Sequence, residues 1–87
     1  MPMQMSSGEM TLLELSPQVL ELHYARPLTG QELARQSRCC KAHATNIRDM
    51  QYWVHPVTST SVLRFTFDRP QLPLSDALKQ ALLAPMH

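Results

Sequence analysis

The sequence predicts one α+β domain made of three helices, a two-stranded β-ribbon and a short C-terminal helix. Three patterns predict it: a helix-capping signal after residue 28, an amphipathic helical pattern over residues 39–51, and a strand-like alternation over residues 62–67. The 87 residues suit one domain at most, and 44% hydrophobic with 17% charged residues are ordinary for a soluble domain. We expect this domain to span residues 10–84, after a disordered N-terminal tail over residues 1–9.

The first helix is predicted over residues 17–26. Ser16 can cap the free amides of its first turn, and Pro17 suits the first helical position because its missing N–H has no partner there. Pro27 ends the helix, since the residue before a proline is pushed out of the helical region. The preceding segment, residues 11–15, is too short to assign and fits a strand or a turn.

The second helix is predicted to begin at a capping box. Thr29 is followed three residues later by Glu32, so the hydroxyl and the carboxylate can accept hydrogen bonds from each other's backbone amides. A break near Ser37 and Arg38 is expected to separate this helix from the third one, although no glycine marks the turn.

The third helix, residues 39–51, has an apolar and a polar side. The apolar side comprises Cys40, His43, Ala44, Ile47, Met50 and Gln51. The opposite side comprises Lys41, Ala42, Thr45, Asn46, Arg48 and Asp49. This separation predicts a helix that packs with one face and presents the other to solvent or to a partner.

Two β-rich runs follow, residues 52–57 and 62–67, with the polar residues 58–61 between them. Pro56 confines the first run to a sheet edge, or ends it, because proline lacks the N–H that a central strand donates. In the second run, the alternation places Leu63, Phe65 and Phe67 on the side that faces the helices. A last helix is predicted over residues 75–83, with Ser75 as its cap and an apolar stripe of Leu78, Ala81 and Leu82.

Charge and composition exclude several classes of protein. The net charge is only +1, but six of the eight basic residues lie between Arg26 and Arg64, with only two of the seven acids. The chain holds two glycines, too few for a glycine-rich phosphate loop. Neither a signal peptide nor an apolar run near the ~18 residues of a membrane helix is present. We therefore expect a cytoplasmic protein without a membrane anchor.

Cys39, Cys40 and His43 are the candidate metal ligands or reactive groups. Zinc usually takes four ligands, and its paired cysteines are usually spaced by two residues or more. Cys40 fits a small buried apolar residue better, and Cys39 could instead form a disulfide. Catalysis would need a nucleophile with a base held in reach, and no such pattern is present. We expect no metal, no cofactor and no enzymatic activity.

The order of two helices, a turn, a third helix and a ribbon resembles the winged helix-turn-helix superfamily. The resemblance covers about residues 16–67, and it lies in the stretches LTGQELARQ (28–36) and ATNIRDMQYW (44–53). It implies a DNA-binding transcriptional regulator that reads the major groove of double-stranded DNA with helix 39–51 and contacts the backbone with the wing. The predicted DNA-binding residues are Arg38, Lys41, Ala42, Thr45, Asn46, Arg48 and Arg64.

Two further expectations concern partners. The apolar stripe of the last helix could join two copies into a homodimer, whose symmetry would match a two-fold operator. The alternative function is that of a non-enzymatic protein-binding adaptor with the same fold, because fold alone does not decide what a surface binds.

Overall fold

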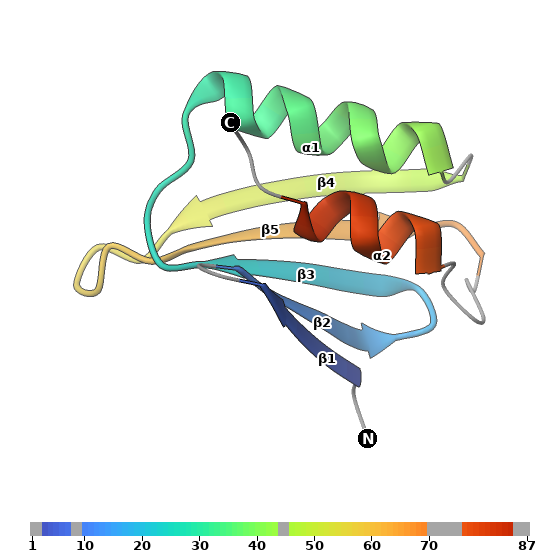
Figure 1. Ribbon diagram of the computed structural model, residues 1–87, viewed down its shortest axis with the longest axis horizontal. Coiled ribbons are helices and arrows are strands. Elements are labelled where there is room, and N and C mark those ends of the chain that lie inside the picture. Colours follow the sequence, from blue (N-terminus) through green and yellow to red (C-terminus); the bar gives the residue numbers. More distant parts are fainter. Residues whose placement is uncertain (1–2, 8–9, 44–45, 70–75, 85–87) are drawn as a thin grey trace.

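The computed structural model describes residues 3–7, 10–43, 46–69 and 76–84. Its elements are, in chain order, β1 (Met3–Ser7), β2 (Met10–Ser16), β3 (Val19–Tyr24), α1 (Gly30–His43), β4 (Ile47–Val54), β5 (Ser61–Phe67) and α2 (Asp76–Leu83). The strands form one antiparallel sheet in the order β1-β2-β3-β5-β4. Both helices lie on the same face of this sheet, with α1 running alongside β4 (Figure 1).

The predicted winged helix-turn-helix fold is wrong, because two of its three helices do not form. Residues 17–26 contain strand β3 instead of a helix, and β3 pairs with β2 on one side and β5 on the other. Ser16 does cap an amide: its hydroxyl accepts a hydrogen bond from Gln18 N–H at 3.2 Å, but within the turn between β2 and β3. The signal that predicted a helix start therefore marks a strand-to-strand turn.

The predicted third helix, residues 39–51, is also wrong. Helix α1 continues through the expected break at Ser37 and Arg38 and ends at His43. From Ile47 onward the chain is strand β4. The capping box is confirmed at the start of α1: Glu32 N–H donates to Thr29 Oγ1 at 3.1 Å, and Thr29 N–H donates to Glu32 Oε1 at 2.9 Å.

The second β-rich run and the last helix are confirmed, and the first run, residues 52–57, is confirmed in part, because its strand ends at Val54. Strands β4 and β5 pair as a hairpin. Both alternatives left open for Pro56 hold, because β4 is an edge strand of the sheet and ends at Val54, before the proline. The hairpin is part of a larger sheet, however, because β5 also pairs with β3. Helix α2 covers residues 76–83, while its expected cap, Ser75, lies outside the described residues. Residues 3–7, expected in a disordered tail, form β1 and pair with β2.

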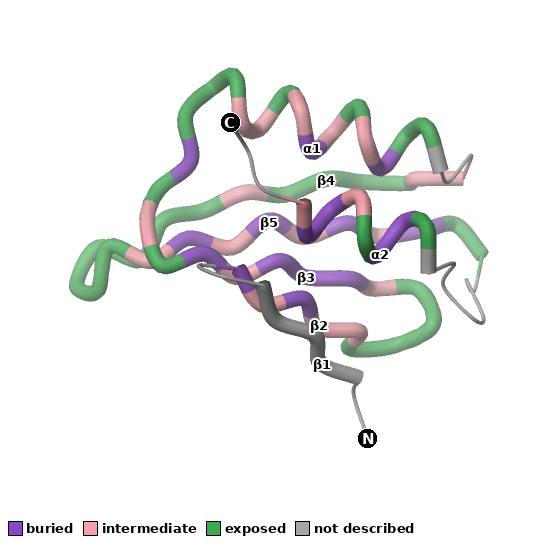
Figure 2. Tube along the Cα trace, viewed as in Figure 1, coloured by how far each residue is buried: buried purple, intermediate pink, exposed green. Residues whose placement is uncertain are grey.

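The core lies between the sheet and the two helices (Figure 2). Leu12, Leu22 and Leu63 are opposite one another on neighbouring strands and fully buried, as are the predicted Phe65 and Phe67. The helices add Cys40, Leu78, Leu82 and Leu83 to the same cluster. Leu78 and Leu82 of the apolar stripe of α2 therefore pack within their own chain.

A buried ion pair attaches α2 to the sheet. Lys79 Nζ lies 2.7 Å from Glu14 Oε1, and the Lys79 side chain is almost wholly buried. A buried ammonium group would be costly without a counter-charge. The pair therefore fixes α2 over β2.

Candidate functional site

The predicted DNA-binding residues do not share one surface. Arg38, Lys41 and Ala42 are exposed on α1, and Arg48 is exposed on β4. Asn46 lies in the connection between these elements, where its backbone carbonyl accepts a hydrogen bond from Asp68 N–H at 2.8 Å. Thr45 lies outside the described residues. Asn46 is therefore not presented on a reading helix.

Arg64 lies on the opposite face of the sheet. It alternates with the buried Leu63 and Phe65, so its side chain leaves β5 on the face that the helices do not cover. Arg64 Nε donates to Glu21 Oε2 at 2.7 Å, and its guanidinium carbon lies 5.2 Å from the centre of the Trp53 ring. The charge of Arg64 is thus already compensated within the chain.

Glu21 is the centre of this polar cluster and is 6% exposed. His23 Nε2 lies 2.8 Å from Glu21 Oε1, on the other side of the carboxylate from Arg64. Burial raises the pKa of Glu21, but the hydrogen bonds from His23 and Arg64 outweigh it and hold the pKa below its ordinary value. A paired, ionised carboxylate of this kind stabilises the packing of β3 against β5.

Cys39 and Cys40 are not joined in a disulfide, and the pKa of each thiol is raised. Burial, followed by the neighbouring Cys39, raises the pKa of Cys40 to about 12. Burial also raises the pKa of Cys39, more than Arg35 lowers it. A nucleophilic thiolate needs the opposite shift. Among the described residues, no group of three or more His, Cys, Asp or Glu side chains could hold a metal ion.

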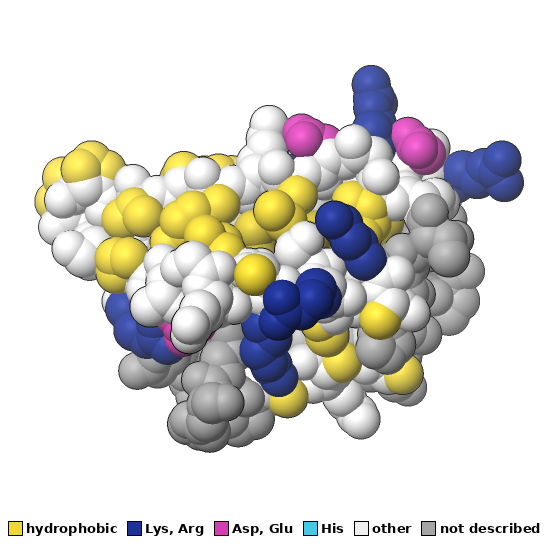
Figure 3. Space-filling view, turned by 90° about the horizontal axis from the view of Figure 1, so that it is seen from above, with side chains coloured by type: hydrophobic (Ala, Val, Ile, Leu, Met, Phe, Trp, Pro, Cys, Tyr) yellow, Lys and Arg dark blue, Asp and Glu magenta, His cyan; other side chains and the backbone are white. Residues whose placement is uncertain are grey.

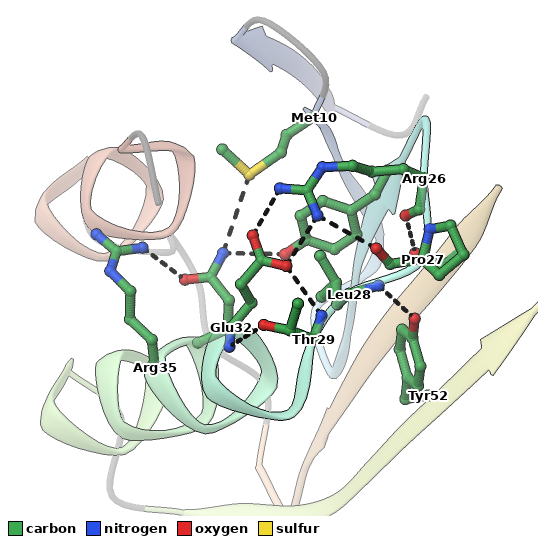
Figure 4. A network of polar contacts seen from close by, with 11 residues as sticks. Met10, Arg26, Pro27, Leu28, Thr29, Glu32, Arg35 and Tyr52 are labelled. Carbon is green, nitrogen blue, oxygen red and sulfur yellow. Dashed lines mark hydrogen bonds and ion pairs between the residues drawn. The ribbon is translucent and has the colours of Figure 1, made fainter. Parts of the chain in front are cut away.

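A network of polar contacts fixes the start of α1 beside β4 (Figure 4). Arg26 donates through both terminal nitrogens to Glu32, at 2.8 and 2.6 Å. Leu28 N–H donates to the Tyr52 hydroxyl at 2.7 Å, which joins the segment before the helix to strand β4. The network holds α1 along the β4 edge.

Strand β4 presents its outer backbone groups at this edge. In an antiparallel pair, alternate residues direct both N–H and C=O to the same neighbour. His55 N–H donates to Thr60 O at 2.8 Å, so His55 points toward the β5 side. Because the two directions alternate along the strand, Met50, Tyr52 and Val54 direct their backbone N–H and C=O groups away from β5. We call these three residues the outer positions of β4. Met50 N–H is bound by its neighbour's carboxylate, Asp49 Oδ1, at 2.9 Å.

The same strand carries exposed apolar side chains. Met50 and Val54 are each 42% exposed and lie on the helix side of the sheet, because they pair with Phe65 and Ser61. Trp53 is 40% exposed on the other face, and Val57, at the hairpin tip, is 84% exposed. A band of hydrophobic side chains is visible on the α1 side of the molecule, with Lys and Arg side chains beside it (Figure 3).

The role of this edge as a candidate site was missed from the sequence, although part of its signal was there. Pro56 indicated an edge, and the run of Tyr52, Trp53 and Val54 is apolar on both faces. Met50 was predicted to be buried on the inner side of a helix, whereas it is exposed on an edge strand.

Comparison of the chain with protein-family models, with curated proteins and with solved structures finds no match. Of the two helices in the described residues, neither has the length and apolar character needed to cross a membrane.

Proposed function

We propose that this chain is a non-catalytic protein-binding module that takes up an extended strand along β4. One observation carries the proposal: the outer positions Met50 and Val54 combine outward backbone groups with exposed apolar side chains. An edge strand of this kind can pair with a strand from another chain, which gains affinity from backbone hydrogen bonds and specificity from alternate side chains.

This function is the protein-binding adaptor that the sequence offered as the alternative, on a five-stranded sheet instead of a winged-helix fold. Reading of the major groove by helix 39–51 is not proposed, because α1 ends at His43 and residues 47–51 lie in strand β4. The basic residues of α1 then supply a positive border to the edge, which favours an acidic side chain in the partner strand.

The two faces of β4 would contact alternate residues of the added strand. On the helix side, Met50 and Val54 offer apolar contacts. On the other side, Trp53 offers an aromatic ring, over which the Arg64 guanidinium lies. We therefore expect the bound strand to have an apolar residue at every second position on the helix side.

Selection of extended peptides from a randomised display library against the full chain tests this proposal. Selected peptides should show the alternating pattern, and Val54→Pro, which removes an outer N–H, should weaken their binding by at least about tenfold. Proline is tolerated at edge positions whose N–H faces solvent, so the variant should stay folded. Val54→Ala is the matched control, because it trims the same side chain and keeps the N–H.

Equal effects of the proline and alanine variants would contradict strand addition, as would a selection that yields no binder for a chain that is monomeric in solution. Duplex DNA of random sequence provides the contrasting measurement. Steep weakening of DNA binding with added salt, together with its loss when Arg38 and Lys41 are replaced, would favour a nucleic-acid partner instead.

A further inference from the structure

We propose that the strand taken up by β4 is the β4 strand of a second copy of this chain. The two strands would pair antiparallel about a two-fold axis at Tyr52 and join two five-stranded sheets into one. This inference rests on the proposed function, because it assumes that the β4 edge accepts a strand, and it names the occupant.

Backbone geometry selects the register. The outer positions of one β4 must lie opposite outer positions of the other, because only they have backbone groups that point outward. With the axis at Tyr52, Met50 of each copy lies opposite Val54 of the other, and Tyr52 lies opposite Tyr52. All three outer positions of both strands then form hydrogen-bonded pairs.

Two neighbouring registers also place outer positions opposite outer positions, but they form poorer hydrogen-bonded pairs. With the axis at Gln51, Val54 lies opposite Arg48, which sits in the bulge where the β4–β5 register shifts between Ile47 and Asp49. With the axis at Trp53, Met50 lies opposite Pro56, which has no N–H to donate. A shift by one residue would oppose outward groups to inward ones.

The side chains agree with the register at Tyr52. On the helix side, Met50 of each copy would contact Val54 of the other copy, so this contact would form twice. Each of these side chains is 42% exposed in a single copy. On the other face, Gln51 would lie against Trp53. These contacts would remove the largest exposed apolar side chains of β4 from water.

Charged groups agree as well. Asp49 of one copy would lie beside His55 of the other, so that a carboxylate meets an imidazole N–H instead of a like charge. Asp49 now accepts a hydrogen bond from Met50 N–H at 2.9 Å. In the pair, that carboxylate would turn to His55 and release Met50 N–H to the carbonyl of the facing Val54.

Two-fold pairing also closes the assembly. If β4 paired with β1, the other edge strand, each copy would expose a new edge and chains would continue to add. Pairing of β4 with β4 uses the same edge of both copies and ends at two. We therefore expect a dimer and not a filament.

Sedimentation of the full chain over a range of concentrations tests the proposal. The wild-type chain should be a dimer at micromolar concentration, and Val54→Asp should weaken the dimer by about 100-fold or more, because it buries two unpaired charges. Val57→Asp is the matched control: the same change at an 84% exposed residue beyond the paired strand should leave the dimer intact. Circular dichroism establishes that both variants are folded.

A cysteine pair tests the register. In a Cys39→Ser background, Gln51→Cys combined with Trp53→Cys should form disulfides between two copies on mild oxidation, because these positions would lie opposite each other as a non-hydrogen-bonded pair. Gln51→Cys alone should not form them. Cross-linking by the single variant, with none by the double variant, would overturn the register.

The outcomes separate the two proposals. A wild-type chain that stays monomeric at high micromolar concentration but binds selected peptides along β4 overturns the dimer and leaves the proposed function standing. Concentration-dependent filaments, or a dimer that Val54→Asp does not weaken, also overturn it. A monomer that binds no peptide overturns both.

Discussion

Gln36 is a fully buried polar residue that joins three elements of the fold. From α1, its Nε2 donates to the Tyr24 hydroxyl of β3 at 2.9 Å and to the Leu82 carbonyl of α2 at 2.8 Å. Leu82 is in the last turn of its helix, where carbonyls have no helical partner. Tyr24 is also buried, and burial raises its pKa to about 12. One side-chain amide therefore satisfies two acceptors away from water.

We predict that Gln36→Leu destabilises the chain even though it replaces a buried polar residue by an apolar one of similar volume. The substitution removes the donor for both acceptors, and a buried acceptor left unsatisfied costs about 1–3 kcal/mol. The expected loss in the free energy of unfolding is therefore about 2–6 kcal/mol. A large fraction of the total stability is at stake, because domains of this size are marginally stable.

Equilibrium unfolding in urea measures this loss. Gln31→Leu is the matched control, because it makes the same chemical change at an exposed position of the same helix and should shift the free energy by no more than about 0.5 kcal/mol. Tyr24→Phe completes a double-mutant cycle that isolates the contact between Gln36 and Tyr24. A loss below about 1 kcal/mol for Gln36→Leu would refute the reasoning, since it would mean that neither acceptor depends on Gln36.

Two further predictions concern the core and the helix start. Phe65→Ala should cost about 3–5 kcal/mol in urea unfolding, because the ring is 1% exposed between sheet and helices; a loss below about 1 kcal/mol would place the ring outside the core. The hydrogen bond from Arg26, followed by that from Thr29, lowers the pKa of Glu32 from 4.5 to about 2. The stabilisation of the fold by ionised Glu32 is therefore complete above about pH 4.5 and lost as the pH falls toward 2. Glu32→Gln should accordingly be less stable than wild type at pH 7, with a difference that shrinks over that range; a difference independent of pH would contradict the ionic origin.

The features that the sequence predicted correctly depend on neighbours in the chain. The capping box joins residues three apart, so Thr29 and Glu32 contain the whole interaction. The alternation of Leu63, Phe65 and Phe67 with polar residues marks a strand with one buried face. Both patterns are complete within a few residues, and the structure reproduces them.

Strand β3 was mistaken for a helix because local signals were ambiguous there. The Ser-Pro pair at residues 16–17 starts helices, but the same serine hydroxyl can accept an amide hydrogen bond in a turn between strands. Leu20, Leu22 and Tyr24 do alternate, but Glu21 among them is buried. Its burial depends on Arg64, 43 residues away, and no local pattern contains that partner.

Strand β4 was mistaken for the end of a helix for a different reason. Ile47 and Met50 are three residues apart, a spacing that places side chains on one face of a helix and on opposite faces of a regular strand. The register shift between Ile47 and Asp49 inserts one residue, so Ile47 pairs with Phe67 while Met50 pairs with Phe65, and both lie on the helix side of the sheet. A β-bulge thus imitates the helical spacing. Met50 does point toward the side that the pattern indicated, and its exposure comes from the position of β4 at the edge of the sheet.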